Sequence, residues 1–197
     1  MRLILASVSP RRRELLARLG VPFETVRPEY EEQHHSVEDP EATCRRLALG
    51  KATQAARRFP EDLVVGADTI VILGGRVMGK PTSLDEARRM LRALSGQTHL
   101  VKTAVALACR DLEHQSVFVE TTEVTFHRLE EDDIERYLSL DPPLDKAGAY
   151  GIQDWSGVFV QQVVGCYHNV VGFPLARFYQ HLKDNGLWPR LLTLKHL

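Results

Sequence analysis

Strand-like and helix-like segments alternate along this chain, and this alternation limits the fold more than any other feature of the sequence. The first unit runs from Leu3 to Gly20. Its apolar residues Leu3–Ala6 predict a short buried strand, and a helical pattern follows at once. Ser9 is a favourable cap, Pro10 suits the first helical position, and Gly20 suits the residue after the end. The chain is therefore expected to begin as a strand–loop–helix unit.

The same alternation continues to the C-terminus. We expect strands near 23–26, 63–73, 98–109, 116–128 and 158–164, and helices over about 40–58, 84–94 and 130–139 and from Pro174 onward. The strand pattern of 63–73 is interrupted at Gly66-Ala67-Asp68, and Gly74-Gly75 predicts a tight turn. Ser83 and Glu86 have the spacing of a helix capping box. The mixture predicts an α/β protein with a mixed sheet rather than a repeating βαβ barrel.

Composition narrows the class of protein. The chain has 197 residues, 44% of them apolar, and a net charge of −1, so we expect one domain over 1–197 and neither nucleic-acid nor membrane-surface binding. No apolar run approaches the roughly 20 residues of a membrane span, and the N-terminus lacks a signal-peptide pattern. Three widely spaced cysteines do not form a disulfide framework. These features predict a cytoplasmic protein.

Three arginines stand at the wrong end of the first predicted helix. A helix N-terminus already carries about half a positive charge, and Arg11, Arg12 and Arg13 add to it. The conflict disappears if an anion binds there, because backbone N–H groups and guanidinium groups both suit phosphate oxygen atoms. The hydroxyl groups of Ser7 and Ser9 are further candidate donors. The alternative is a surface helix with a solvated basic face.

Asp68 interrupts an otherwise apolar β pattern, "LVVGADTIVILGG". A carboxylate in such surroundings is costly unless it is paired, hydrogen-bonded or bound to a metal ion, and acids in such places are often functional. The alternative is an aspartate whose oxygen atoms are satisfied by backbone amides.

Two further segments carry charged residues. The segment "GGRVMGKP" has the glycine and lysine spacing of a phosphate-binding P-loop, but Pro81 stands where Ser or Thr would hold magnesium, which excludes that class. Lys80 is either a point charge for phosphate or a surface lysine. In "EYEEQHH", Glu31 and Glu32 suit Mg²⁺, while His34 and His35 hint at zinc without a matching cluster. A solvated acidic loop is the alternative there.

A glycine-rich segment, "DKAGAYGIQ", ends in Gln153. Its side-chain amide both donates and accepts hydrogen bonds, as recognition of a base edge requires. Tyr150 in the same segment could stack on a base or pack in the core. No G-x-S-x-G motif is present, so the sequence does not support a function as a serine hydrolase.

Together these segments resemble the Maf family of nucleoside triphosphate pyrophosphatases, distant structural relatives of inosine triphosphatases. The matching stretches occur in the family's order over nearly the whole chain: "LASVSPRRRELL", "YEEQ", "LALGKA", "GADTIVI", "GKP", "LSGQTH", "DKAGAYGIQ" and "YHNVVGFP". The resemblance implies an elongated mixed β-sheet with flanking helices and two lobes around a central cleft. It also implies metal-dependent hydrolysis between the α- and β-phosphates, with a divalent cation, Mg²⁺ or Mn²⁺, as cofactor.

The resemblance also assigns roles to residues. The family's basic residues fall on Arg11, Arg12, Lys51 and Lys80, where they would hold the triphosphate. Ser7 is a further candidate for substrate binding through its hydroxyl group. Its catalytic aspartate, the proton acceptor for the attacking water, falls on Asp68, which is also a candidate metal ligand. An acid matching Glu32 would help to bind the metal, with Glu31 adjacent.

The subgroup is also recognisable. "GADT" and "DKAGAYGIQ" resemble the branch that acts on dTTP and UTP, whose specificity positions fall on Arg11, Thr69 and Gln153. Modified pyrimidine nucleotides are further candidate substrates, and the resemblance carries an expectation of a homodimer. Gly50 departs from relatives, which often carry Glu, Gln or Lys there, and a glycine loosens a helix by up to about 1 kcal/mol. A non-hydrolysing, nucleotide-binding regulator of cell division is the alternative function.

Overall fold

A single mixed sheet organises the chain, as the alternation of strands and helices predicts. The computed structural model describes residues 1–30 and 39–193. Its seven strands follow the order β2-β1-β3-β5-β6-β7, with β4 paired to β3. The chain divides into two compact units, which are described separately: one comprises 1–68, 103–120 and 172–197, and the other comprises 69–102 and 121–171. The division falls within β3 (Leu63–Leu73), β5 (Thr98–Cys109) and β6 (His114–Phe126).

The first unit is built on parallel strands. β1 (Leu3–Ala6) pairs in parallel with β2 (Phe23–Val26) on one side and with β3 on the other, and the register places Ala6 opposite Gly66. All four side chains of β1 are buried. The strand is continuously apolar instead of alternating because its side chains are buried on both faces of the sheet.

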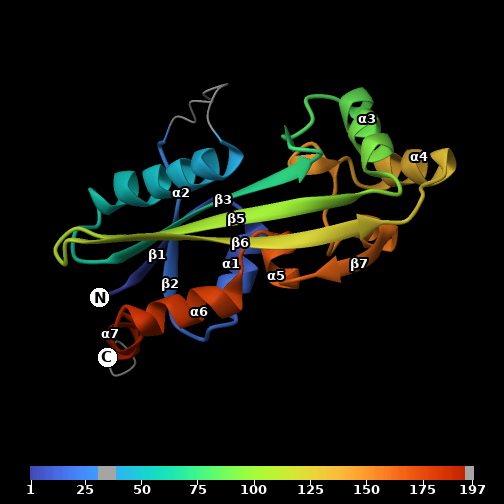
Figure 1. The fold of residues 1–197 in the computed structure, drawn as a ribbon. Coiled ribbons are helices and arrows are strands. Elements are labelled where there is room, and N and C mark those ends of the chain that lie inside the picture. The colour runs from blue at the N-terminus through green and yellow to red at the C-terminus, as the bar shows by residue number, and fades with distance from the viewer. Residues whose placement is uncertain (31–38, 194–197) are drawn as a thin grey trace. The chain divides into compact units, whose positions relative to one another are not determined.

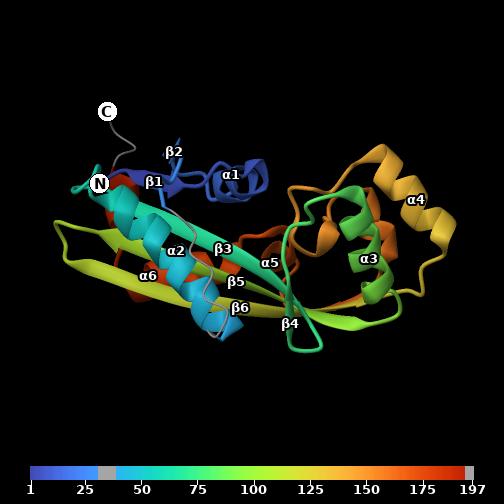
Figure 2. The same cartoon turned by 90° about the horizontal axis from the view of Figure 1, so that it is seen from above.

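Helices cover both faces of the sheet in this unit. The helices are α1 (Pro10–Ala17), α2 (Pro40–Ala56), α6 (Leu175–Asp184) and α7 (Trp188–Leu192). Figures 1 and 2 show α2 on one face and α6 on the opposite face. Helix α2 buries an apolar stripe: Leu47, Ala48, Ala52, Ala55 and Ala56.

Helix α1 begins and is capped as its sequence predicts. The Ser9 hydroxyl accepts a hydrogen bond from the backbone N–H of Arg12 at 3.4 Å, and Pro10 is the first helical residue. Gly20 follows the helix with a φ of 68°. Leu15 and Leu16 are buried and fix the helix to the unit.

Strand β3 is continuous, so the expected interruption at Gly66-Ala67-Asp68 is wrong. The glycine serves close packing instead of a break. A Cβ atom at Gly66 would lie 2.3 Å from the carbonyl oxygen of Ala48 and 2.7 Å from the backbone nitrogen of Ala52. The missing side chain therefore lets α2 lie directly on β3.

The second unit joins the remaining elements. They are β4 (Arg76–Met78), α3 (Leu84–Leu94), α4 (Glu131–Leu140), two 3₁₀ turns (Ala147–Ala149 and Trp155–Phe159), β7 (Val160–Val164) and α5 (Tyr167–Val171). The β3–β4 hairpin turns at Gly74 and Gly75, both with positive φ, as predicted. Strand β7 begins two residues later than expected because the second 3₁₀ turn occupies the preceding residues.

Helices α3 and α4 lie side by side in this unit (Figure 2). Arg88 and Arg92 of α3 form ion pairs with Glu135 and Glu131 of α4. At the start of α3 the Ser83 hydroxyl accepts from the backbone N–H of Glu86, as in a capping box. The returning bond differs from the expected one, because the Glu86 carboxylate accepts from the backbone N–H and the hydroxyl of Thr82.

The core of the second unit contains one histidine. His99 is 1% exposed, and its Nε2 shares a 2.8 Å hydrogen bond with the hydroxyl of Tyr150. Phe126 packs edge-on against both rings. Tyr150 is thus a core residue. Among the described residues, no helix combines the length and apolar character needed to cross a bilayer.

Candidate functional site

An ion pair between α2 and β3 forms the centre of the candidate site. The Lys51 ammonium donates a hydrogen bond to Oδ1 of Asp68 at 2.7 Å, and the two side chains are 9% and 13% exposed. Lys51 lies on the same face of α2 as the apolar stripe, which carries its ammonium toward the sheet. Asp68 is therefore paired with a cation, whereas the alternative interpretation expected backbone amides as its partners.

Arg12 joins this pair from α1. Its Nη1 donates to the carbonyl oxygen of Ala67 at 3.0 Å, and its Nε donates to the carbonyl oxygen of Gly172 at 3.0 Å. The guanidinium group therefore lies beside the residue that precedes Asp68 in β3. It is not the freely solvated group of a surface helix, because two of its donors hold backbone carbonyl groups in place.

Cys44 lies next to the charged groups of Asp68, Arg12 and Lys51. Its thiol donates to the carbonyl oxygen of Asp68 at 3.3 Å, and the residue is fully buried. Burial, and then the nearby charge of Asp68, raise the pKa of Cys44 to about 12, while Arg12 and Lys51 act in the opposite direction. All three candidate site residues therefore lie within electrostatic range of one buried thiol.

A small hollow lies at the N-terminus of α1, next to the ends of β1 and β2. Its volume is about 290 Å³, and its polar lining comprises Ser7, Ser9, Arg13, Thr25 and Arg27. The carboxyl edge of a parallel sheet and a helix N-terminus are both common anion-binding positions. Because Ala6 pairs with Gly66, the loop after β1 begins beside the part of β3 that holds Asp68.

The arginines of α1 divide between these two places. Arg12 reaches the carbonyl groups near Asp68, whereas Arg13 lines the hollow. Arg11 is half-buried on the same helix. Ser7 is 8% exposed, and its hydroxyl accepts a hydrogen bond from the backbone N–H of Ser9 at 3.2 Å.

The other predicted substrate-binding residues belong to the second unit. Thr69 directly follows Asp68 in β3 and is half-buried. Lys80 is exposed in the segment between β4 and α3. Gln153 is exposed, and its Nε2 donates to Oδ1 of Asp154 at 3.1 Å. The structure thus brings together Arg12, Lys51 and Asp68 within the first unit.

Of the expected metal ligands, the structure describes only Asp68. Glu31, Glu32, His34 and His35 lie outside the described residues. In 1–30 and 39–193, no group of three His, Cys, Asp or Glu side chains could hold a metal ion. Asp68 offers carboxylate oxygen, the donor that Mg²⁺ and Mn²⁺ prefer, and Mg²⁺ usually takes only one or two protein carboxylates, the rest of its ligands being water and substrate phosphates. The donor chemistry of Asp68 therefore fits such an ion.

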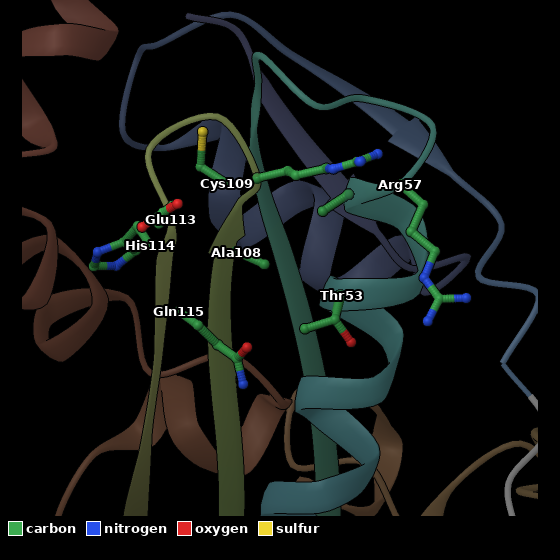
Figure 3. Close-up of a pocket in the computed structure, with 9 residues that line it drawn as sticks. Thr53, Arg57, Ala108, Cys109, Glu113, His114 and Gln115 are labelled. Carbon is green, nitrogen blue, oxygen red and sulfur yellow. The ribbon is translucent and has the colours of Figure 1, made fainter.

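A larger cavity lies elsewhere in the first unit. Its volume is about 510 Å³, and Thr53, Arg57, Ala108 and Gln115 line it between α2 and the β5–β6 turn (Figure 3). It contains none of the residues predicted for the substrate or the metal. Size alone therefore does not identify the candidate site in this unit.

Gly50, the departure from the family pattern, has a local explanation. A Cβ atom at this position would lie 2.3 Å from Cζ of Tyr30. The glycine thus makes room for an aromatic ring against α2. The helix continues through Gly50 without a break, and Lys51 reaches Asp68 as described.

Sequence reasoning missed two residues of this site, Cys44 and Gly66. Cys44 entered only the count of cysteines, although it lies seven residues before Lys51 and hence on the same helix face. Gly66 was interpreted as an interruption of the strand. The spacing along α2 was the signal for the first, whereas nothing in the sequence indicates which helix approaches the second.

These observations define an α/β protein in which a lysine–aspartate pair, an arginine and a helix N-terminus lie near the C-terminal end of β1. The chain belongs to the Maf family, because the family model for Maf-like proteins matches residues 2–185. A dTTP/UTP pyrophosphatase from Escherichia coli strain K12 is 51% identical over 183 residues, which cover 92% of each chain. A dTTP/UTP pyrophosphatase from Thermotoga petrophila is 47% identical over 190 residues, or 95% of this chain and 91% of the relative.

A dTTP/UTP pyrophosphatase from Bacillus cereus strain B4264 is 47% identical over 183 residues, or 93% of this chain and 95% of the relative. Among solved structures, a HAM1 protein from Coxiella burnetii is 16% identical and has a TM-score of 0.49, over 93% of this chain and 99% of that chain.

Proposed function

We propose that this chain is a nucleoside triphosphate pyrophosphatase that hydrolyses dTTP and UTP to the monophosphate and pyrophosphate. The observation that carries the proposal is the Lys51–Asp68 pair, with Nζ and Oδ1 2.7 Å apart, in a chain of the Maf family. Support for the substrates comes from relatives of 47–51% identity that are named dTTP/UTP pyrophosphatases. Modified pyrimidine nucleotides are further candidates.

Asp68 is the proposed proton acceptor. Lys51 fixes the carboxylate by holding Oδ1, and within 1–30 and 39–193 no side chain or backbone group is bonded to Oδ2. That oxygen is therefore placed to orient a water molecule and take its proton. The attack of this water on the α-phosphorus would release pyrophosphate as the leaving group.

The cationic residues would bind the triphosphate. Arg12, Lys51 and the hollow at the start of α1 supply guanidinium, ammonium and backbone N–H donors that suit phosphate oxygen atoms. We assign further phosphate contacts to Ser7, Arg11 and Lys80, and base recognition to Arg11, Thr69 and Gln153. A divalent metal ion, when bound by Asp68 and Glu32, would neutralise negative charge on the phosphates.

The experiment measures pyrophosphate release by the purified protein from UTP, dTTP and a panel of other canonical and modified triphosphates, with Mg²⁺ or Mn²⁺. The test variant is Asp68→Asn. We expect turnover to fall by at least about 100-fold, the usual range for loss of a general base, while UTP binding measured by calorimetry persists. Asp111→Asn, at an exposed position of the β5–β6 turn, is the control.

Two outcomes would overturn parts of the proposal. Near-normal turnover of Asp68→Asn removes this residue from catalysis. Nucleotide binding without any product in the wild-type protein favours the nucleotide-binding regulator. We also propose a cytoplasmic location, supported by three cysteines that form no disulfide among themselves. The proposed homodimer rests on the family resemblance alone. Light scattering on the purified protein tests the dimer.

A further inference from the structure

Two histidines of the first unit meet at one serine hydroxyl. His114 and Ser116 lie two residues apart in β6, so their side chains share one face of the strand. Nε2 of His114 is 3.0 Å from Oγ of Ser116, and Nε2 of His181 in α6 is 2.9 Å from the same oxygen. Figure 3 shows the His114 ring on one side of β6 and Gln115 on the other.

The hydroxyl can satisfy both rings only if they are in different states. Ser116 has one hydroxyl proton to donate, so one Nε2 accepts that proton and the other Nε2 must donate its own. One imidazole therefore already directs a lone pair at the shared oxygen. The second needs only a change of tautomer to do the same.

The surroundings keep the two rings neutral. Burial lowers the pKa of His114, and burial followed by the charge of His114 lowers the pKa of His181. Asp184 opposes this effect at His181, and Arg177 adds to it. The His181 ring also packs on Phe118, with 4.8 Å between the ring centroids. Neutral imidazole is the form that binds metal ions.

We propose that His114 and His181, with Ser116 between them, form a binding site for a divalent transition-metal ion of the zinc type. Imidazole nitrogen suits Zn²⁺, Ni²⁺ and Cu²⁺, whereas Mg²⁺ prefers oxygen. The site is therefore chemically distinct from Asp68 and does not depend on the proposed hydrolysis. A metal–nitrogen bond of about 2.1 Å is shorter than the present hydrogen bonds, so the half-exposed rings must rotate toward each other.

The ligand set also predicts modest affinity. Among the residues that the structure describes, no third His, Cys, Asp or Glu completes a cluster. The remaining positions would be taken by Ser116 and water. Because β6 and α6 each supply one histidine, the bound ion would link two elements that are far apart in sequence, and it should raise the unfolding temperature.

The experiment titrates tag-free protein with Zn²⁺ in excess Mg²⁺, using calorimetry and thermal unfolding. We expect one ion per chain and a rise in unfolding temperature. His114→Ala and His181→Ala should each weaken Zn²⁺ binding by at least about 10-fold, since even the loss of an outer-shell partner costs that much. Ser116→Ala removes the weakest proposed ligand, which water can replace, so it should weaken Zn²⁺ binding less than either histidine variant. Unfolding curves without zinc establish that each variant is folded.

Matched controls separate this site from other histidines. His127→Ala removes an exposed imidazole of the second unit, and His34→Ala/His35→Ala removes the adjacent pair noted in the sequence. Both should bind Zn²⁺ like the wild type. The proposal is overturned if the His114→Ala/His181→Ala double variant binds normally, or if the His34/His35 variant alone loses binding.

NMR of the imidazole nitrogen atoms in the unaltered protein is a second test. Zn²⁺ should shift the signals of His114 and His181, and unshifted signals would refute the site.

Discussion

Replacing Gly66 with alanine tests how α2 is held on β3. The added Cβ atom would lie 2.3 Å from the Ala48 carbonyl oxygen and 2.7 Å from the Ala52 nitrogen. Ordinary contact begins at 3.4 Å, so the helix must move by about 1 Å. Both obstacles are backbone atoms, and no side-chain rotation relieves the clash. Overpacking of this kind costs about 1–3 kcal/mol.

The displacement also reaches the candidate site. Lys51 lies between the two obstructing residues of α2, so moving the helix changes the 2.7 Å contact between its Nζ and Oδ1 of Asp68. We therefore expect Gly66→Ala to lower both the free energy of unfolding and the turnover of UTP. For a chain of this size, each kcal/mol lowers Tm by roughly 2–4 °C.

The control is Gly79→Ala, where an added Cβ atom meets nothing within 4 Å. Such a replacement usually stabilises by about 0.4–1 kcal/mol, because it restricts the unfolded chain. The assays are urea denaturation and pyrophosphate release. The reasoning is refuted if Gly66→Ala matches the wild type or the control in both assays.

Three further predictions concern buried or clamped groups. Burial lowers the pKa of His99 from 6.5 to about 4. Between these two pH values the unfolded chain binds more protons than the folded chain. The free energy of unfolding should therefore fall by up to about 3 kcal/mol as the pH drops from 6.5 to 4. His99→Gln should flatten this dependence in urea titrations, and an unchanged slope would contradict the assignment. Because burial raises the pKa of Cys44 to about 12, iodoacetamide at mildly alkaline pH should modify the half-buried Cys166 before Cys44. Equal modification rates of the two cysteines, measured by peptide mapping, would contradict this prediction. Arg12→Lys loses at least one of two hydrogen bonds to backbone carbonyl groups and should lower the free energy of unfolding by about 1–2 kcal/mol. The control Arg89→Lys, at an exposed position, should not lower it measurably. Equal denaturation midpoints for the two variants would show that the Arg12 contacts do not stabilise the fold.

Local patterns in the sequence determined most of the individual elements. The Ser9 cap and the Gly74-Gly75 turn are short-range features, and the structure confirms both of them. Their energetics depend on neighbouring residues in the chain, so hydrophobic period and capping chemistry suffice to predict them. The motifs also led to the Maf family, which the comparisons confirm.

The tertiary structure alone decided which distant residues meet. Only the packing shows that Gly66, where an interruption was expected, is the position at which α2 contacts β3. It also shows that the Cys44 thiol contacts the Asp68 carbonyl group, and that Lys51 pairs with Asp68, 17 positions further along the sequence. The same holds for His114 and His181, whose spacing carries no motif. Propensity and periodicity describe the chain within a few residues, whereas these contacts depend on how whole helices pack on the sheet.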